Sequence, residues 1–163
     1  MPTVYITGID DQGRSCVLER HEISSASGPL EVLRLDDAVA AVPATSPGVE
    51  LLAPMTAEGG AFYNIFSWAP DQGTGLHRTV SHDVDVVLQG TVELGLEAET
   101  VRLHAGDVVV LRGHAHSWKG GPGGGIMLYS LIAGRPTGTD IDREVAPHKE
   151  LDEARRGQTA ASS

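Results

Sequence analysis

The sequence has little of what several specialised protein classes depend on. It contains one cysteine, Cys16, in 163 residues, so no internal disulfide can form. No apolar run approaches the roughly 20 residues that span a bilayer, and the N-terminus lacks a basic segment followed by an apolar one. The length suits one domain. We therefore expect a single-domain protein of the cytoplasm that does not associate with a membrane.

Positive charge is also scarce. The chain has 12 Lys and Arg against 22 Asp and Glu, a formal net charge of -10. No basic cluster is long enough to follow a phosphate backbone, which argues against nucleic acid as a partner. An acidic surface mainly keeps a protein soluble, so the sign of the charge does not identify a substrate.

Aromatic residues make up only 4% of the chain, whereas glycine (20) and proline (9) are frequent, a composition typical of many short strands and turns. Thr3–Thr7 and Ser15–Glu19 are predicted to form an N-terminal hairpin, because the segment between them has the Asp and Gly residues that suit a turn. Residues 24–58 are rich in Ser, Pro, Ala and Gly, with one strand candidate at Leu30–Leu35. We expect an arm that lies on the main body.

Short apolar runs with turn signals between them recur from Ala61 onward, a spacing that predicts an all-β sandwich or barrel. They are Ala61–Trp68, Leu76–Val80, Val84–Leu88, Val92–Leu96, Thr100–His104 and Val108–Leu111. After a predicted turn at Gly120–Gly125, the run Ile126–Ile132 closes the series as a strand buried on both faces.

These patterns divide the chain into three parts. We predict a hairpin and arm over residues 1–60, a barrel over 61–136, and a polar tail over 137–163. The tail has little to bury, so we expect it to be flexible. Glu150–Arg156 could form a short helix, but one or two turns are marginal without packing.

Residues with metal-binding chemistry cluster around two of these strands. His77 and Thr79 lie on one side of a strand because alternate residues share a face, and Asp83 follows the next turn. His116 lies past the end of another strand, where it could meet His77 across the barrel. Two imidazoles and one carboxylate are a minimum ligand set for a first-row metal with open positions, but their spacing does not separate iron, zinc, copper and nickel.

Two segments resemble the two sequence motifs of the cupin superfamily. They are His77–Gly90, which begins His-Arg-Thr and carries Asp83, and Gly106–Trp118, which ends Arg-Gly-His-Ala-His-Ser-Trp. The resemblance covers roughly residues 61 to 133. It implies a cupin-type jelly-roll β-barrel, a site inside the barrel, and a homodimer.

The resemblance also implies a ligand set, with departures from the usual pattern. His77 and His116 occupy histidine positions and Asp83 the position of a glutamate, so these three are the predicted metal ligands. Thr79 stands where a further histidine is usual and is a poor ligand, and Arg112 stands where proline is usual. The predicted cofactor is one divalent ion, Fe, Zn, Mn or Ni, with a metal-free barrel as the alternative.

Other residues near these motifs are candidates for catalysis and substrate binding. Asp85 shares the face of Asp83 and is a candidate general base, with a solvated position after a bulge as the open alternative. Thr79 is the second candidate for moving a proton. The predicted pocket residues are Trp68, Arg112 and Trp118, although the tryptophans could instead pack in the wall and Arg112 could hold a carbonyl.

Alternation predicts that the neighbours of these residues face away from the site. We expect His82 and His114 to be exposed to solvent, and Arg78 to form an ion pair or cover the exterior of the barrel.

Two classes of function follow. The first is a small-molecule metabolic enzyme that performs metal-assisted lyase, isomerase, dehydratase or cyclase chemistry on a small oxygenated substrate, with an Fe(II) dioxygenase as its variant. Biosynthesis-associated cupins with the His-Arg-Thr start suggest the non-oxidative form. The second is a metal-free ligand-binding cupin. In either case a small molecule is the partner, and an N-terminal hairpin that pairs with a neighbouring barrel would be one way to form the dimer.

Overall fold

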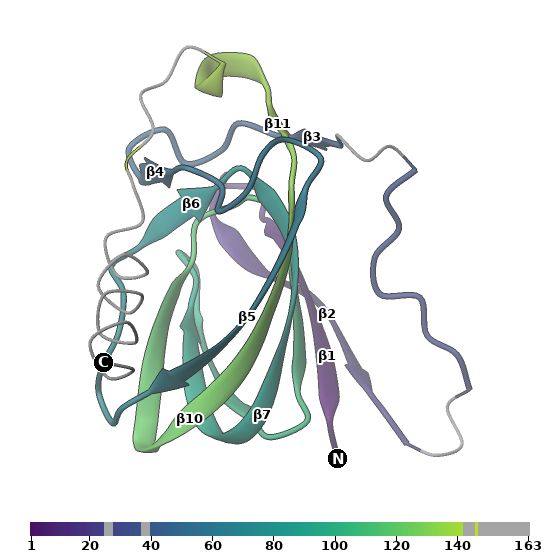
Figure 1. Cartoon of the computed structure of the whole chain (residues 1–163), viewed down its shortest axis with the longest axis vertical. Coiled ribbons are helices and arrows are strands. Elements are labelled where there is room, and N and C mark those ends of the chain that lie inside the picture. The colour runs from purple at the N-terminus through teal and green to yellow at the C-terminus, as the bar shows by residue number, and fades with distance from the viewer. Residues whose placement is uncertain (25–27, 37–39, 142–145, 147–163) are drawn as a thin grey trace, which may run out of the picture.

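A jelly-roll barrel built almost entirely of strands makes up the computed structural model, which describes residues 1–24, 28–36, 40–141 and 146 (Figure 1). The elements are β1 (Thr3–Ile9), β2 (Ser15–Glu22), β3 (Ala41–Val42), β4 (Glu50–Leu52), β5 (Ala61–Trp68), β6 (His77–Thr79), β7 (Ser81–Gly95), β8 (Thr100–His104), β9 (Val108–Leu111), β10 (Ser117–Ala133), β11 (Arg135–Pro136) and the 3-10 turn η1 (Gly138–Asp140). The all-β prediction is confirmed.

Strand β7 pairs with three other strands of the main sheet, in which the strands run in the order β2-β1-β9-β7-β10-β5. Its first half pairs with β9 and its second half with β8, while β10 runs along its other edge. The two strands predicted at Val84–Leu88 and Val92–Leu96 are therefore one, continuous through Gly90. That glycine has φ 71°, and a Cβ there would meet the Gly124 carbonyl oxygen.

The predicted turn at Gly120–Gly125 is wrong, because β10 passes through this segment as an irregular strand. Its pairing with β7 shifts register between Gly120 and Gly125. Glycine is required along this course because the neighbouring strand β7 lies very close: a Cβ at Gly121 would overlap the Thr91 hydroxyl.

The N-terminal hairpin is confirmed and is part of the main sheet. β1 pairs in parallel with β9, joining Val4 to Val108. Within the arm, β3 pairs with β11 and β4 pairs with β6, so this segment covers one end of the barrel (Figure 1). The strand predicted at Leu30–Leu35 is wrong: these residues have no ladder partner in the described chain. The hairpin pairs with its own barrel, and the homodimer stays a prediction.

Aliphatic side chains from β7, β8 and β9 close one part of the barrel interior. Val92, Leu94, Leu103, Val109 and Leu111 are fully or almost fully buried in one cluster with Trp68, Trp118 and Met127. The helix predicted at Glu150–Arg156 lies outside the described residues, and among those described no helix is long and apolar enough to cross a membrane.

Candidate functional site

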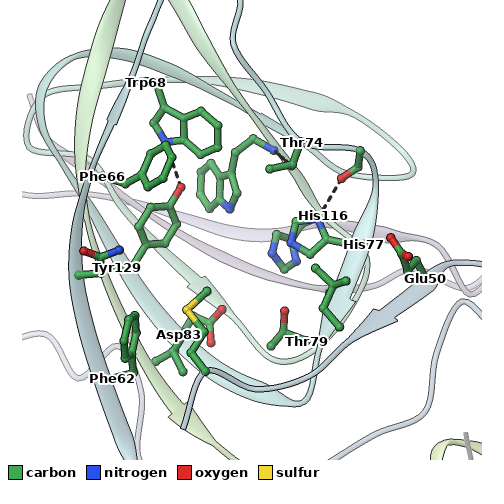
Figure 2. Close-up of a pocket in the computed structure, with 16 residues that line it drawn as sticks. Glu50, Phe62, Phe66, Trp68, Thr74, His77, Thr79, Asp83, His116 and Tyr129 are labelled. Atoms are coloured by element: carbon green, nitrogen blue, oxygen red, sulfur yellow. Dashed lines mark hydrogen bonds between the residues drawn. The ribbon is translucent and has the colours of Figure 1, made fainter. Parts of the chain in front are cut away.

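A cavity of about 190 Å³ opens inside the barrel, between the aromatic residues of β5 and β10 and the polar residues of β6 and β7 (Figure 2). Its aromatic wall comprises Phe62, Phe66, Trp68, Trp118 and Tyr129. Its polar wall comprises His77, Thr79, Asp83 and His116, and Glu50 and Thr74 also line it. The cavity is smaller than the roughly 300–1,000 Å³ of drug-sized sites, so it suits a small ligand.

Backbone pairing brings the two predicted histidines together. His77 and His116 form an antiparallel bridge, each donating its backbone N–H to the other's carbonyl at 2.9 Å. Their ring centroids lie 4.5 Å apart. The β6 strand and the start of β10 thus present both rings on the same side of the cavity.

Both imidazoles are oriented by backbone carbonyls. His77 Nδ1 lies 2.9 Å from the Gly75 oxygen and His116 Nδ1 lies 3.0 Å from the His114 oxygen. A carbonyl only accepts, so each Nδ1 carries the proton and Nε2 is the accepting nitrogen of the neutral ring. Burial lowers the pKa of His77, opposed by the Gly75 carbonyl and the charge of Glu50.

Asp83 is a buried carboxyl that faces the cavity. Only 7% of the residue is exposed, and within the described chain its Oδ1 has no hydrogen-bond partner. Burial raises the pKa of Asp83 to about 7, against the influence of the Ser81 hydroxyl. A carboxyl that exchanges its proton near neutral pH is suited to general acid–base catalysis.

Asp85 lies deeper on the same face of β7 and does not line the cavity. It is 1% exposed, which rules out the solvated alternative. Its Oδ1 accepts the Ser130 backbone N–H at 3.2 Å, and its Oδ2 has no partner within the described residues. Burial, followed by the charge of Asp83, raises the pKa of Asp85 well above the usual range.

The predicted three-ligand metal set stays a prediction. The rings of His77 and His116 lie together on the cavity wall, so these residues could supply two of its three ligands. In the part of the chain that the structure describes, no group of three or more His, Cys, Asp or Glu side chains is placed to hold an ion. Asp83 lines the same cavity as the two histidines, and its role as the third ligand stays a prediction.

Trp68 and Trp118 line the cavity, and the indole N–H of Trp68 donates to the Tyr129 hydroxyl at 3.0 Å. The prediction that Arg112 lines the pocket is wrong. Arg112 lies at the surface, in a separate hollow beside Leu30 and Glu31. Residue 112 follows the end of β9, where alternation turns it outward.

Sequence reasoning missed much of the aromatic wall. Phe62, Asn64 and Phe66 share one face of β5 with Trp68, and Tyr129 on the adjacent strand β10 pairs with Asn64. The alternation of residues within Ala61–Trp68 could have identified the β5 residues as sharing the face of Trp68. Glu50 had no such signal, because only its tertiary pairing with β6 brings it to the cavity.

The opposite face of the site strands is buried, so the expected exposure of His82 and His114 is wrong. They are 5% and 2% exposed. The reason is that the arm and β1 cover this face: His114 Nε2 lies 2.6 Å from the Thr7 hydroxyl. Burial, followed by the charge of Arg78, lowers the pKa of His114 to about 4, so its ring is neutral.

Arg78 forms the expected ion pair but is fully buried instead of covering the exterior. Its Nη1 lies 2.8 Å from Asp140. Its other donors reach the carbonyls of Gly113 at 2.9 Å, Thr45 at 2.6 Å and Pro43 at 2.9 Å. One guanidinium thereby joins β6, the arm and η1.

Comparison with known proteins gives partial matches, and no protein-family model matches the chain. The cupin-domain-containing oxidoreductase fogC of Aspergillus ruber is 29% identical over 150 residues, covering 78% of this chain and 70% of the relative. The phomopsin biosynthesis cluster protein C' of Diaporthe leptostromiformis is 32% identical over 99 residues, covering 59% of this chain and 49% of the relative.

The cupin-domain-containing oxidoreductase virC of Hypocrea virens is 32% identical over 88 residues, covering 51% of this chain and 45% of the relative. Apart from fogC, the chain spans about half or less of the length of the curated relatives it matches. A solved cupin superfamily protein from Desulfitobacterium hafniense is 20% identical with a TM-score of 0.42, covering 45% of this chain and 67% of that chain.

Proposed function

This chain belongs to the cupin superfamily, and we propose that it is a small-molecule biosynthetic enzyme that catalyses proton transfer on a small oxygenated substrate inside the barrel. The reaction class is that of lyases, isomerases, dehydratases and cyclases. One observation carries the proposal: the Asp83 carboxyl is buried in the cavity wall with an oxygen that has no partner among the described residues. The names of relatives from biosynthesis clusters support the metabolic setting.

A buried carboxyl oxygen without a partner is unfavourable for folding, so its retention requires another explanation. A substrate supplies one if it brings the missing hydrogen-bond partner. Asp83 would take a proton from a carbon next to a carbonyl group, and the electron pair of that bond would form an enolate. The Thr79 hydroxyl, also on the polar wall, would donate a hydrogen bond to the enolate oxygen.

Return of the proton from Asp83 completes the cycle. Delivery to the same carbon gives exchange with solvent, and delivery to another carbon gives isomerisation, with no net oxidation in either case. The aromatic wall gives the cavity an apolar surface, which favours both the raised pKa of Asp83 and the enolate's hydrogen bonds.

Solvent exchange tests this proposal without knowledge of the natural substrate. We expect the protein in D₂O to accelerate deuterium incorporation into uncharged cyclic ketones such as 2-tetralone, followed by NMR. General base catalysis typically contributes about 10²–10⁴-fold, so Asp83→Asn should lose at least about 100-fold. Glu93→Gln, on the same strand but outside the cavity, is the matched control and should keep the parent rate.

Either of two results would refute the proposal. One is the absence of exchange above the buffer rate across the whole ketone panel. The other is an Asp83→Asn variant that is as active as Glu93→Gln. Tight binding of the ketones without exchange would favour a ligand-binding barrel that does not catalyse proton transfer.

A metal-dependent reaction, including Fe(II) dioxygenase chemistry, is the second candidate. The orientation of the two imidazoles favours it, because an Nδ1–H to carbonyl bond is the usual support of a histidine that ligates through Nε2. The relatives called oxidoreductases favour it as well. His77 and His116 would be the ligands, and the ion would supply Lewis-acid or redox chemistry.

Elemental analysis separates the two candidates. The protein is purified without chelator or a histidine tag, alongside His77→Ala and His116→Ala. Near-stoichiometric metal that is lost in both variants would make the metal-dependent reaction the leading candidate. A parent protein that holds no metal, even after reconstitution with Fe(II), Zn, Mn and Ni, would eliminate it.

A further inference from the structure

The chemistry of the cavity walls points to a substrate class, and we infer that the substrate is an uncharged, planar ring compound that carries hydroxyl groups. This inference rests on the proposed function only in taking the cavity as the substrate site. It follows from three properties of the cavity: the sign of the charges that line it, the rings on one wall and the hydrogen-bonding atoms on the other.

The charged side chains of the lining argue against an anionic substrate. Within the described chain, the cavity is lined by the carboxyl groups of Asp83 and Glu50 and by no lysine or arginine. Arg78 points to the covered face of the barrel and Arg112 lies in another hollow. A carboxylate or phosphate ester inside the cavity would be desolvated next to carboxyl groups without a cation to balance it, which is strongly unfavourable.

The aromatic wall favours a flat ligand. Phe66 lies 4.6 Å from Trp68 and 6.5 Å from Tyr129, centroid to centroid, and Trp118 lies 5.8 Å from Tyr129. Figure 2 shows Phe66, Trp68 and Tyr129 on one side of the cavity and His77 and His116 on the other. A planar ring between these walls would contact aromatic faces and edges, an arrangement that stabilises such pairs.

The polar wall presents an unsatisfied acceptor. Asp83 lines the cavity, and its buried Oδ1 lacks a donor among the described residues. A ligand complements acceptors by contributing donors, and an uncharged ring contributes them most simply as hydroxyl groups. A phenol or an enolised cyclic ketone has this chemistry.

The two tryptophans of the chain provide a direct readout, because Trp68 and Trp118 both line the cavity. Binding is followed by the shifts of the two indole N–H signals in ¹⁵N-labelled protein. The probes are resorcinol, 1,3-dimethoxybenzene, benzoate and benzylamine, which separate hydroxyl donors, a bare ring, an anion and a cation. We expect resorcinol to bind at least 10-fold more tightly than each of the other three.

Two variants test whether Asp83 is the residue that recognises the hydroxyl group of the ligand. Asp83→Asn should lower the affinity for resorcinol about 10-fold, as expected for one buried hydrogen bond to a charged or polar group, and should leave 1,3-dimethoxybenzene unaffected. Glu93→Gln should change neither affinity. A structural disturbance caused by Asp83→Asn would weaken both ligands equally and is thereby distinguished from loss of the hydrogen bond.

Several outcomes overturn the inference: no indole shift with any probe, equal affinities for all four, or benzoate or benzylamine binding as tightly as resorcinol. The proposed function fails separately. The expected order of affinities without ketone exchange would leave the inference standing and refute the proton-transfer proposal, whereas ketone exchange with preferred benzoate binding would do the reverse.

Discussion

Arg78 and Asp83 are both buried ionisable groups on strands that follow each other in the chain, yet their surroundings differ completely. Arg78 is fully buried with an aspartate and three backbone carbonyls as partners. Asp83 is almost as deeply buried with an unpartnered oxygen in the described structure, next to a second buried carboxyl, Asp85. A buried charge with all its partners serves the fold, whereas one without them has a role that folding does not explain.

The largest effect expected from this contrast is on Arg78. Arg78→Met should lower the free energy of unfolding by about 3–5 kcal/mol, because it removes one member of a buried ion pair and the donor to three carbonyls. Arg102→Met is the control, since its pair with Glu93 is exposed and should contribute at most about 1 kcal/mol. Urea denaturation measures both, and similar losses in the two variants would contradict the structural role of Arg78.

Replacing Asp83 is expected to raise the free energy of unfolding, the opposite of the effect at Arg78. The pKa of this carboxyl in the folded protein, about 7, is above the ordinary aspartate value of 3.8, so the parent loses stability as the pH rises from the lower value through about 7, and the loss levels off above that. Asp83→Asn removes the ionisation and should raise the free energy of unfolding at pH 8 by about 1–3 kcal/mol, with a smaller gain at pH 5. Urea denaturation at both pH values tests this.

A loss of stability at pH 8 in Asp83→Asn would show that the carboxylate has partners in the folded protein. A gain of equal size at pH 5 and pH 8 would show that ionisation is not its cause. The combination of higher stability with lost exchange activity is the outcome that the functional role of Asp83 predicts.

The smallest effect concerns a polar pair that is satisfied within the cavity itself. Tyr129→Phe removes the acceptor of the Trp68 indole N–H and should lower the free energy of unfolding by about 1 kcal/mol. It should also shift one of the two indole N–H signals while ketone exchange persists. Loss of exchange in this variant would mean that the Tyr129 hydroxyl takes part in the reaction.

The strand pattern was accessible from the sequence where alternation and turn residues agree. Ala61–Trp68, Thr100–His104 and Val108–Leu111 were predicted with the boundaries of β5, β8 and β9. Prediction failed at glycines: Gly90 and the Gly120–Gly125 segment were interpreted as breaks, yet the strands continue. Most of these glycines are there because other segments of the same chain lie too close for a side chain. Propensity does not contain this information, since it depends on what packs against the backbone.

The candidate site shows the same division. His77, Thr79, Asp83 and His116 were identified from spacing and resemblance, and all four line the cavity. The exposure of His82 and His114 was mispredicted because alternation gives the face of a residue and says nothing about what covers it. Residues from the arm and β1 cover that face, and these segments are distant in sequence from both histidines.

By itself the sequence determined the all-β class, most strand positions and the residues with site chemistry, because hydrophobic period and side-chain type are local properties. Only the tertiary structure decided which buried ionisable groups are paired. It also placed the aromatic wall opposite the polar wall of the cavity (Figure 2). Burial, pairing and cavity shape depend on contacts between segments far apart in the chain, and those contacts exist only once the barrel has closed.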